Sequence, residues 1–158
     1  MTNQERAYIE TEYSCAYCGI KDKKSLTIDH IDGRKNKNSL SYDNLIVLCH
    51  NCHYQKTNKK IEIEEIKKIK KVLLYKTLTV FGINALKMAS RNEYGVAATP
   101  FLLMHMVEMG MLKKEETICE EIELGTESGK LLNKIVSEAR FIITEEGERI
   151  YKKWFKSR

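Results

Sequence analysis

The first pattern along the chain is a β-prone stretch, "LTIDHIDG", which surrounds Asp29 and His30 and ends in a predicted turn at Gly33. Because a strand sends neighbouring side chains to opposite faces, Asp29 and His30 cannot both be buried against one apolar surface. A bend or bulge in the strand would let both reach a common site. Further on, Asn44 precedes the apolar run "LIVLC", and His53 stands at the start of a predicted helix.

The pattern changes at residue 61. The segment "IEIEEIKKIKKVLLYK" repeats apolar residues at helical spacing, with Glu and Lys on the other faces, which predicts an amphipathic helix. The apolar positions of this helix are Ile61, Ile66, Ile69, Val72 and Leu73. The next segment, "LTVFGINALKMASR", continues the helical pattern.

The remainder of the chain alternates between helical and β-prone segments. Pro100 after Thr99 predicts the start of a helix that ends near Gly110, and "TEEGERIYKKWFKSR" predicts a final capped helix. Between them, "TICEEIEL" and "ARFIIT" are β-prone. We therefore predict an α+β protein with a first module over residues 1–60, a connecting helix over 61–76 and a mainly helical domain over 77–158.

Composition restricts the function. The chain has 158 residues, of which 42% are apolar, and no stretch approaches the roughly 18 apolar residues of a membrane span. The N-terminal "MTNQERAYIE" lacks the apolar run of a secretory signal. Both features predict a cytoplasmic protein without a membrane span.

The net charge of +5, from 27 basic and 22 acidic residues, is concentrated in the first module. Such a cluster is typical of a protein that binds a polyanion such as DNA, although the charges taken alone favour a solvated lysine-rich surface. The cations of this cluster are Lys21, Lys23, Lys24, Arg34, Lys35, Lys37, Lys56, Lys59 and Lys60.

Four of the five cysteines form two C-x2-C pairs. In a reducing compartment this spacing indicates metal binding rather than disulfides, and four thiolates complete a tetrahedral Zn²⁺ site. Such a closed site cannot activate water, so we predict a structural zinc at Cys15, Cys18, Cys49 and Cys52. His50 is interpreted as a surface or phosphate-contacting residue, with the alternative that it replaces Cys52 as a ligand.

The order C-x2-C-G, "IDHI", "DNL" and "LCHNCH" between Tyr13 and Lys60 resembles the HNH nuclease family in its four-cysteine zinc form. The resemblance implies a ββα-metal core, with a β-hairpin and a helix around one catalytic divalent cation. It places His30 as general base, Asp29 and His53 as ligands of Mg²⁺ or Mn²⁺, and Asn44 as the residue that steadies the loop and the base or reaches the metal.

Each of these residues also has a structural interpretation. Asp29 could cap a turn, Asn44 could cap a helix or turn, and His30 could be a hydrogen-bonded core histidine. The expected contacts with DNA come from the cations around this site, which are Arg34, Lys35, Lys37 and Lys56.

The C-terminal part resembles winged-helix domains in two short segments, the tail from Gly110 to Lys113 and the capped start from Thr144 to Gly147. A base-reading helix should carry polar residues, yet the predicted helix that begins at Pro100 offers mainly His105 and Glu108. Residues 111–158 also balance ten basic against ten acidic side chains. Contact with DNA and dimerisation therefore both remain open for this part.

The sequence thus predicts a small zinc-stapled HNH module followed by a winged-helix-like domain. The predicted function is metal-dependent hydrolysis of DNA phosphodiester bonds, with DNA as the partner and a homodimer as a possible assembly. One alternative is a non-catalytic zinc-containing winged-helix DNA-binding regulator, and another is a protein-interaction module.

Overall fold

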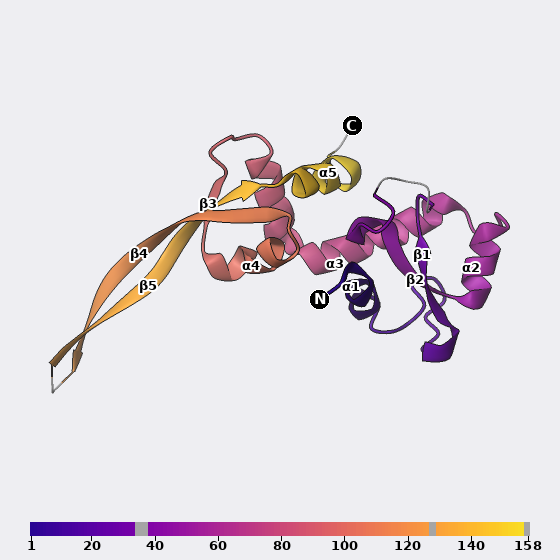
Figure 1. Cartoon of the computed structure of the whole chain (residues 1–158), viewed down its shortest axis with the longest axis horizontal. Coiled ribbons are helices and arrows are strands. Elements are labelled where there is room, and N and C mark those ends of the chain that lie inside the picture. Colours follow the sequence, from indigo (N-terminus) through magenta and orange to yellow (C-terminus); the bar gives the residue numbers. More distant parts are fainter. Residues whose placement is uncertain (34–37, 127–128, 157–158) are drawn as a thin grey trace. The chain divides into compact units, whose positions relative to one another are not determined.

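The computed structural model describes residues 1–33, 38–126 and 129–156, and the side chains within these ranges except those of 118–137. The described chain forms two compact units, Met1–Thr77 and Leu78–Arg158. Figure 1 labels the elements along the chain.

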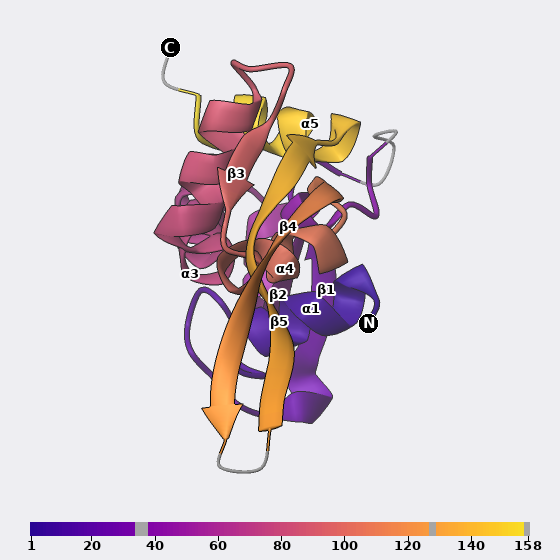
Figure 2. The ribbon, with the colours of Figure 1, turned by 90° about the vertical axis from the view of Figure 1, so that its left-hand side faces the viewer.

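An antiparallel hairpin of two strands, β1 and β2, organises the first unit. The helices α1 and α2 cover it from opposite sides, as Figure 1 shows, and both pack against β2. Figure 2 shows α1 beside β1 and β2. All five residues of β2 are consequently buried. The elements of this unit are α1 (Asn3–Glu10), η1 (Lys23–Ser25), β1 (Leu26–His30), η2 (Tyr42–Asn44), β2 (Leu45–Cys49), α2 (His50–Thr57) and the start of α3 (Ile63–Ala89).

The long helix α3 is two helical segments joined at Thr79. Thr79 has φ 59° and ψ 163°, which is an unfavourable backbone conformation for a β-branched residue. Its hydroxyl accepts a hydrogen bond from the Gly82 N–H at 3.3 Å and so caps the second segment. By length and composition alone α3 could cross a membrane, which is weak evidence because the core helix of a soluble protein passes the same test.

The buried face of α3 in the first unit contains a lysine. Lys70 lies between Ile66 and Leu74 at helical spacing, and all three are completely buried. Its ammonium donates a hydrogen bond to Glu10 Oε2 at 2.7 Å and lies 4.1 Å from the centre of the Tyr42 ring. Tyr42 donates to the other Glu10 oxygen at 2.7 Å, so α1, η2 and α3 meet at one polar cluster.

The second unit is built on a three-stranded antiparallel sheet in the order β3-β5-β4. Helix α4 packs against β4 and β5. Gly147 lets α5 begin close to β4, because a Cβ there would overlap the Met111 carbonyl oxygen. The elements are the second segment of α3, β3 (Val96–Ala98), α4 (Pro100–Glu108), β4 (Leu112–Thr126), β5 (Gly129–Ile143) and α5 (Glu145–Trp154).

Several expectations hold and two need correction. The structure is α+β, α4 begins at Pro100, and the Thr144 hydroxyl caps α5 by accepting from the Gly147 N–H at 3.1 Å. The second unit is not mainly helical, however, because β4 and β5 each extend over 15 residues as one hairpin. On α3, Val72 is 68% exposed although its spacing predicted a core position.

Candidate metal centre and active site

The β-hairpin brings the two C-x2-C pairs together. The Cys15 N–H donates to the Ile20 carbonyl, and the Ala16 N–H donates to the Val47 carbonyl, which fixes the first pair beside β2. The second pair begins at Cys49, the last residue of β2, and continues into the first turn of α2 at Cys52. The first pair therefore lies beside the strand that leads into the second.

The four cysteine sulfurs lie within 4.8 Å of one another. Zn–S bonds of about 2.3 Å in a tetrahedron place the sulfurs about 3.8 Å apart. The Cys18 and Cys49 sulfurs are separated by 3.7 Å, so the cluster has the size that a zinc ion requires.

The environment of the cluster favours a thiolate at Cys15 but disfavours one at Cys52. Burial disfavours the Cys15 thiolate, but hydrogen bonds from the backbone N–H groups of Cys18, Cys49 and Tyr17 outweigh it and lower the pKa of Cys15 to about 7. Burial raises the pKa of Cys52, because a second buried thiolate would have no counter-charge. A zinc ion supplies that charge, and the donor set fits it as a structural site.

A second cluster joins Asp29 of β1 to His53 and Lys56 of α2. Asp29 is 7% exposed, and its Oδ1 lies 3.4 Å from His53 Nε2. The Lys56 ammonium donates to Asp29 Oδ2 at 2.5 Å and to the His30 carbonyl oxygen at 2.8 Å. The Asp29 carboxylate therefore lies between an imidazole and an ammonium, both supplied by α2.

The strand that carries Asp29 and His30 is regular. The register between β1 and β2 continues without a shift from Leu26, opposite Cys49, to His30, opposite Leu45. The register therefore contains no bulge at Asp29 or His30, which are the last two residues of β1. His30 is half-buried at the end of β1, and its backbone, rather than its side chain, is what Lys56 contacts.

Asn44 fixes the chain on both sides of the segment that follows β1. Its Oδ1 accepts from the Asp32 N–H at 2.8 Å, and its Nδ2 donates to the Ser39 carbonyl at 3.1 Å. Its own carbonyl accepts from the Ile31 N–H at 2.8 Å. Asn44 is 1% exposed, so these bonds form out of contact with water and position the residues immediately after His30.

The predicted DNA contacts separate into two groups. Arg34, Lys35 and Lys37 lie outside the described residues. Lys56 is described, and its side chain is only 12% exposed because it is bound to Asp29 and His30. Sequence reasoning placed Lys56 on a DNA-binding surface and so missed its contact with the acidic residue of the site. The spacing between His53 and Lys56, which puts both on one face of α2, could have indicated it.

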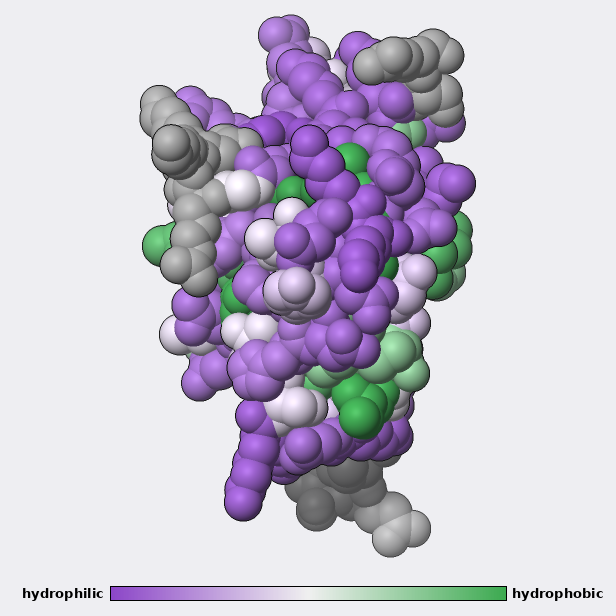
Figure 3. All heavy atoms as spheres, turned by 90° about the vertical axis from the view of Figure 1, so that its right-hand side faces the viewer, coloured by the Kyte–Doolittle hydropathy of each residue, from purple (hydrophilic) through white to green (hydrophobic). Residues whose placement is uncertain are grey.

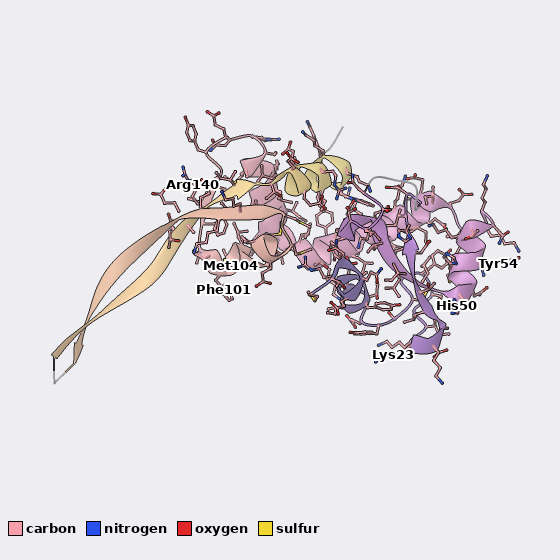
Figure 4. The ribbon with its side chains drawn as sticks, viewed as in Figure 1. Lys23, His50, Tyr54, Phe101, Met104 and Arg140 are labelled. Atoms are coloured by element: carbon pink, nitrogen blue, oxygen red, sulfur yellow. The ribbon has the colours of Figure 1, made fainter. Side chains whose placement is uncertain are left out.

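His50 lies on the outer side of α2 together with Tyr54, as Figure 4 shows, and both are exposed. The sulfur of Cys52 belongs to the four-cysteine cluster, so His50 does not replace it there. Viewed from the side on which α2 lies, the surface is mostly hydrophilic, with separate hydrophobic spots (Figure 3). This face is therefore suited to solvent or to a polar partner.

Comparison with known proteins agrees with the geometry of the first unit. The sequence model of the family described as HNH endonuclease matches residues 15–59. Neither a curated protein nor a solved structure matches the chain. The matched range contains both cysteine pairs, the whole hairpin and α2, so this segment and its four-cysteine cluster fit the HNH endonuclease family.

Proposed function

We propose that the chain is a metal-dependent HNH-type endonuclease that hydrolyses DNA phosphodiester bonds. The observation that supports this most is the pairing of Asp29, on β1, with His53 at 3.4 Å, on the helix that also carries Cys52 of the four-cysteine cluster. A structural zinc site needs neither residue. A carboxylate beside an imidazole instead provides two of the ligands that a second, catalytic ion would use.

Asp29 and His53 would hold Mg²⁺ or Mn²⁺. Two ligand atoms about 2.1 Å from one ion and 3.4 Å apart subtend roughly 108°, so the observed separation permits both to bind it. When bound, the ion supplies positive charge at the scissile phosphate and the leaving 3′ oxygen. The Lys56 ammonium already lies beside Asp29, and this ion pair supports the proposal that the carboxylate binds a cation.

His30 is proposed as the general base. A neutral imidazole accepts a proton near pH 7, here from the water that attacks the phosphorus. The strand end that carries His30 is held from both sides, by Lys56 at its carbonyl and by Asn44 at the following residues. These contacts position the end of β1, from which His30 would act as the base.

The test is a plasmid-nicking assay with Mg²⁺ or Mn²⁺, comparing the unaltered chain with His30→Ala. His30→Ala should remove cleavage and leave zinc content and DNA binding nearly intact, because losing a base affects the transition state. His50→Ala is the matched control, since it removes an exposed imidazole from the same module and should cleave normally. If supercoiled, linear and branched DNA all stay uncut by the unaltered chain, the non-catalytic regulator becomes the better explanation.

For the second unit we propose a winged-helix-like domain. Its order of helix, strand, helix, long hairpin and capped helix supports this. The outer side of α4 carries Phe101, which is 89% exposed, and Met104, which is 37% exposed (Figure 4). Apolar side chains on that helix favour contact with protein, including a homodimer, over reading of bases.

A further inference from the structure

A pocket in the second unit gathers cations that the proposed mechanism does not use. It lies between the end of α3 and the C-terminal half of α5 and has a volume of about 280 Å³. Lys87 and Arg91 line it from one side, and Lys152 and Lys156 line it from the other. The two sides are more than 60 residues apart in the sequence, so the fold rather than a local run of lysines creates this concentration of charge.

The charge of the pocket is only partly compensated. Glu148 is the carboxylate in its lining, and it pairs with Lys152 at 2.7 Å. Within the part of the chain that the structure describes, no ion pair joins Lys87, Arg91 or Lys156 to an acidic side chain. Three positive charges therefore surround one concave surface without a counter-ion.

The helix dipoles of α3 and α5 do not explain why these cations converge on one pocket. Helix dipoles favour cations in the last turn on any face. Lys153, beside Lys152 in α5, satisfies that preference while lying 5.0 Å from the centre of the Trp154 ring and outside the pocket lining. Like charges that converge on a hollow instead favour an anion inside it.

Tyr151 adds a hydrogen-bond donor to the lining of the pocket. The residue is 6% exposed, and its phenol hydroxyl can donate to a bound anion. A phosphate oxygen in the pocket would accept from this hydroxyl and neutralise the cations around it.

We infer that this pocket binds backbone phosphates of duplex DNA and is the phosphate anchor of the second unit. The inference rests on the proposed function, which makes DNA the substrate. The outer side of α4 offers the apolar Phe101 and Met104 (Figure 4), so the pocket is better suited to phosphates than that helix is. Phosphate groups could also come from a free anion, and the experiment separates the two sources.

The experiment measures DNA affinity in full-length His30→Ala protein, which binds without cutting. Fluorescence anisotropy with a short labelled duplex, over a series of KCl concentrations, gives the Kd and its salt dependence. The test variant adds Lys87→Gln, Arg91→Gln and Lys156→Gln, all at exposed positions, and the matched control adds Lys153→Gln.

Each phosphate contact contributes about 0.9 to the slope of log K against log salt, so the triple substitution should reduce the slope by roughly 2.7. At about 0.1 M salt its Kd should rise at least tenfold, whatever the DNA sequence. Lys153→Gln should leave both values unchanged. Tyr151→Phe should raise the Kd severalfold without changing the slope, because it removes a hydrogen bond and no charge.

A triple variant with the slope of its parent would overturn the inference, and so would a parent that binds no duplex. Calorimetry with inorganic phosphate tests the other source. Saturable phosphate binding that these substitutions remove, with unchanged duplex binding, would assign the pocket to a free anion and also overturn it. Cleavage is measured separately with His30 intact: absence of cleavage rejects the proposed nuclease, whereas normal cleavage with an unchanged slope rejects only the phosphate anchor.

Discussion

Replacing Lys70 by methionine should strongly destabilise the first unit, because it leaves the Glu10 carboxylate buried without its cation. The Lys70 and Glu10 side chains are 0% and 1% exposed and form an ion pair at 2.7 Å. Methionine keeps the length of the aliphatic chain, so the substitution removes the charge with little change in packing.

The expected loss follows from this burial. Breaking a buried ion pair by removing one partner costs about 3–5 kcal/mol, since the remaining charge is uncompensated. The Tyr42 hydroxyl still donates to Glu10, so we expect the lower end, about 3 kcal/mol. At 1.36 kcal/mol per factor of ten, this is a loss of roughly 150-fold in the folding equilibrium.

Hydrogen exchange measured by mass spectrometry can locate the effect within the full-length chain. Peptides from β2 should lose protection in Lys70→Met, whereas peptides from α5 report on the second unit. Lys76→Met is the matched control, because Lys76 pairs with Glu12 at 2.6 Å between the same two regions of the chain. That pair is 62% and 66% exposed, so its removal should cause no measurable loss of protection.

The double variant Glu10→Gln with Lys70→Met tests the reason for the loss. If an unpaired buried charge is responsible, neutralising Glu10 should restore much of the protection that Lys70→Met removes. The reasoning is refuted if the double variant is as unstable as Lys70→Met alone, or if Lys70→Met is as harmless as Lys76→Met.

Two further predictions concern the metal sites. Cys52→Ser should lower the zinc content measured by elemental analysis from one ion per chain to none, and it should remove the hydrogen-exchange protection of the hairpin. The control Cys119→Ser should retain the zinc. A Cys52→Ser protein that is free of zinc but well folded would contradict the structural role of the ion. Lys56→Met should lower the Mn²⁺ concentration needed for half-maximal cleavage, because no ammonium then competes with the ion for Asp29. The control Lys56→Arg keeps the positive charge and should not lower it. A higher Mn²⁺ requirement in Lys56→Met would contradict this and show that Lys56 helps to build the site.

The features that sequence predicted well are those encoded over short distances. Two residues between paired cysteines allow both sulfurs to face one ion, so the four-sulfur cluster followed from spacing alone. Pro100 in the first turn predicted the start of α4, and Thr144, whose hydroxyl accepts from the Gly147 N–H, predicted the start of α5, because both signals depend on neighbouring residues. These elements required no knowledge of the distant chain.

The buried face of α3 could not be predicted in this way. Helical spacing placed Val72 in the core and the lysines in solvent, yet Val72 is 68% exposed and Lys70 is buried. The acid that makes a buried lysine possible is Glu10, which is 60 positions away in the sequence. Periodicity ranks positions by side-chain polarity, so it cannot identify a polar residue whose partner is brought to it by the tertiary fold.

The position of Lys56 was missed for a related reason. A lysine just after a zinc knuckle is compatible with a solvated surface, and only the packing of α2 on the hairpin brings its ammonium to Asp29. The pocket at Lys87 and Lys156 likewise joins two helix ends that are far apart in the sequence. Each case depends on a contact between elements rather than on a local pattern.

The geometry of α2 links the zinc to the proposed catalytic site. Cys52 and His53 are neighbours in the first turn of this helix, and Lys56 follows one turn later on the face that meets Asp29. Cys49, which ends β2, supplies both a zinc ligand and the cap of the helix, since its sulfur accepts from the Cys52 N–H at 3.5 Å. A zinc ion bound to Cys49 and Cys52 would hold the first turn of α2 in place. Because His53 belongs to that turn and lies 3.4 Å from Asp29, loss of zinc should remove the proposed catalytic site even when Asp29, His30 and His53 are all intact.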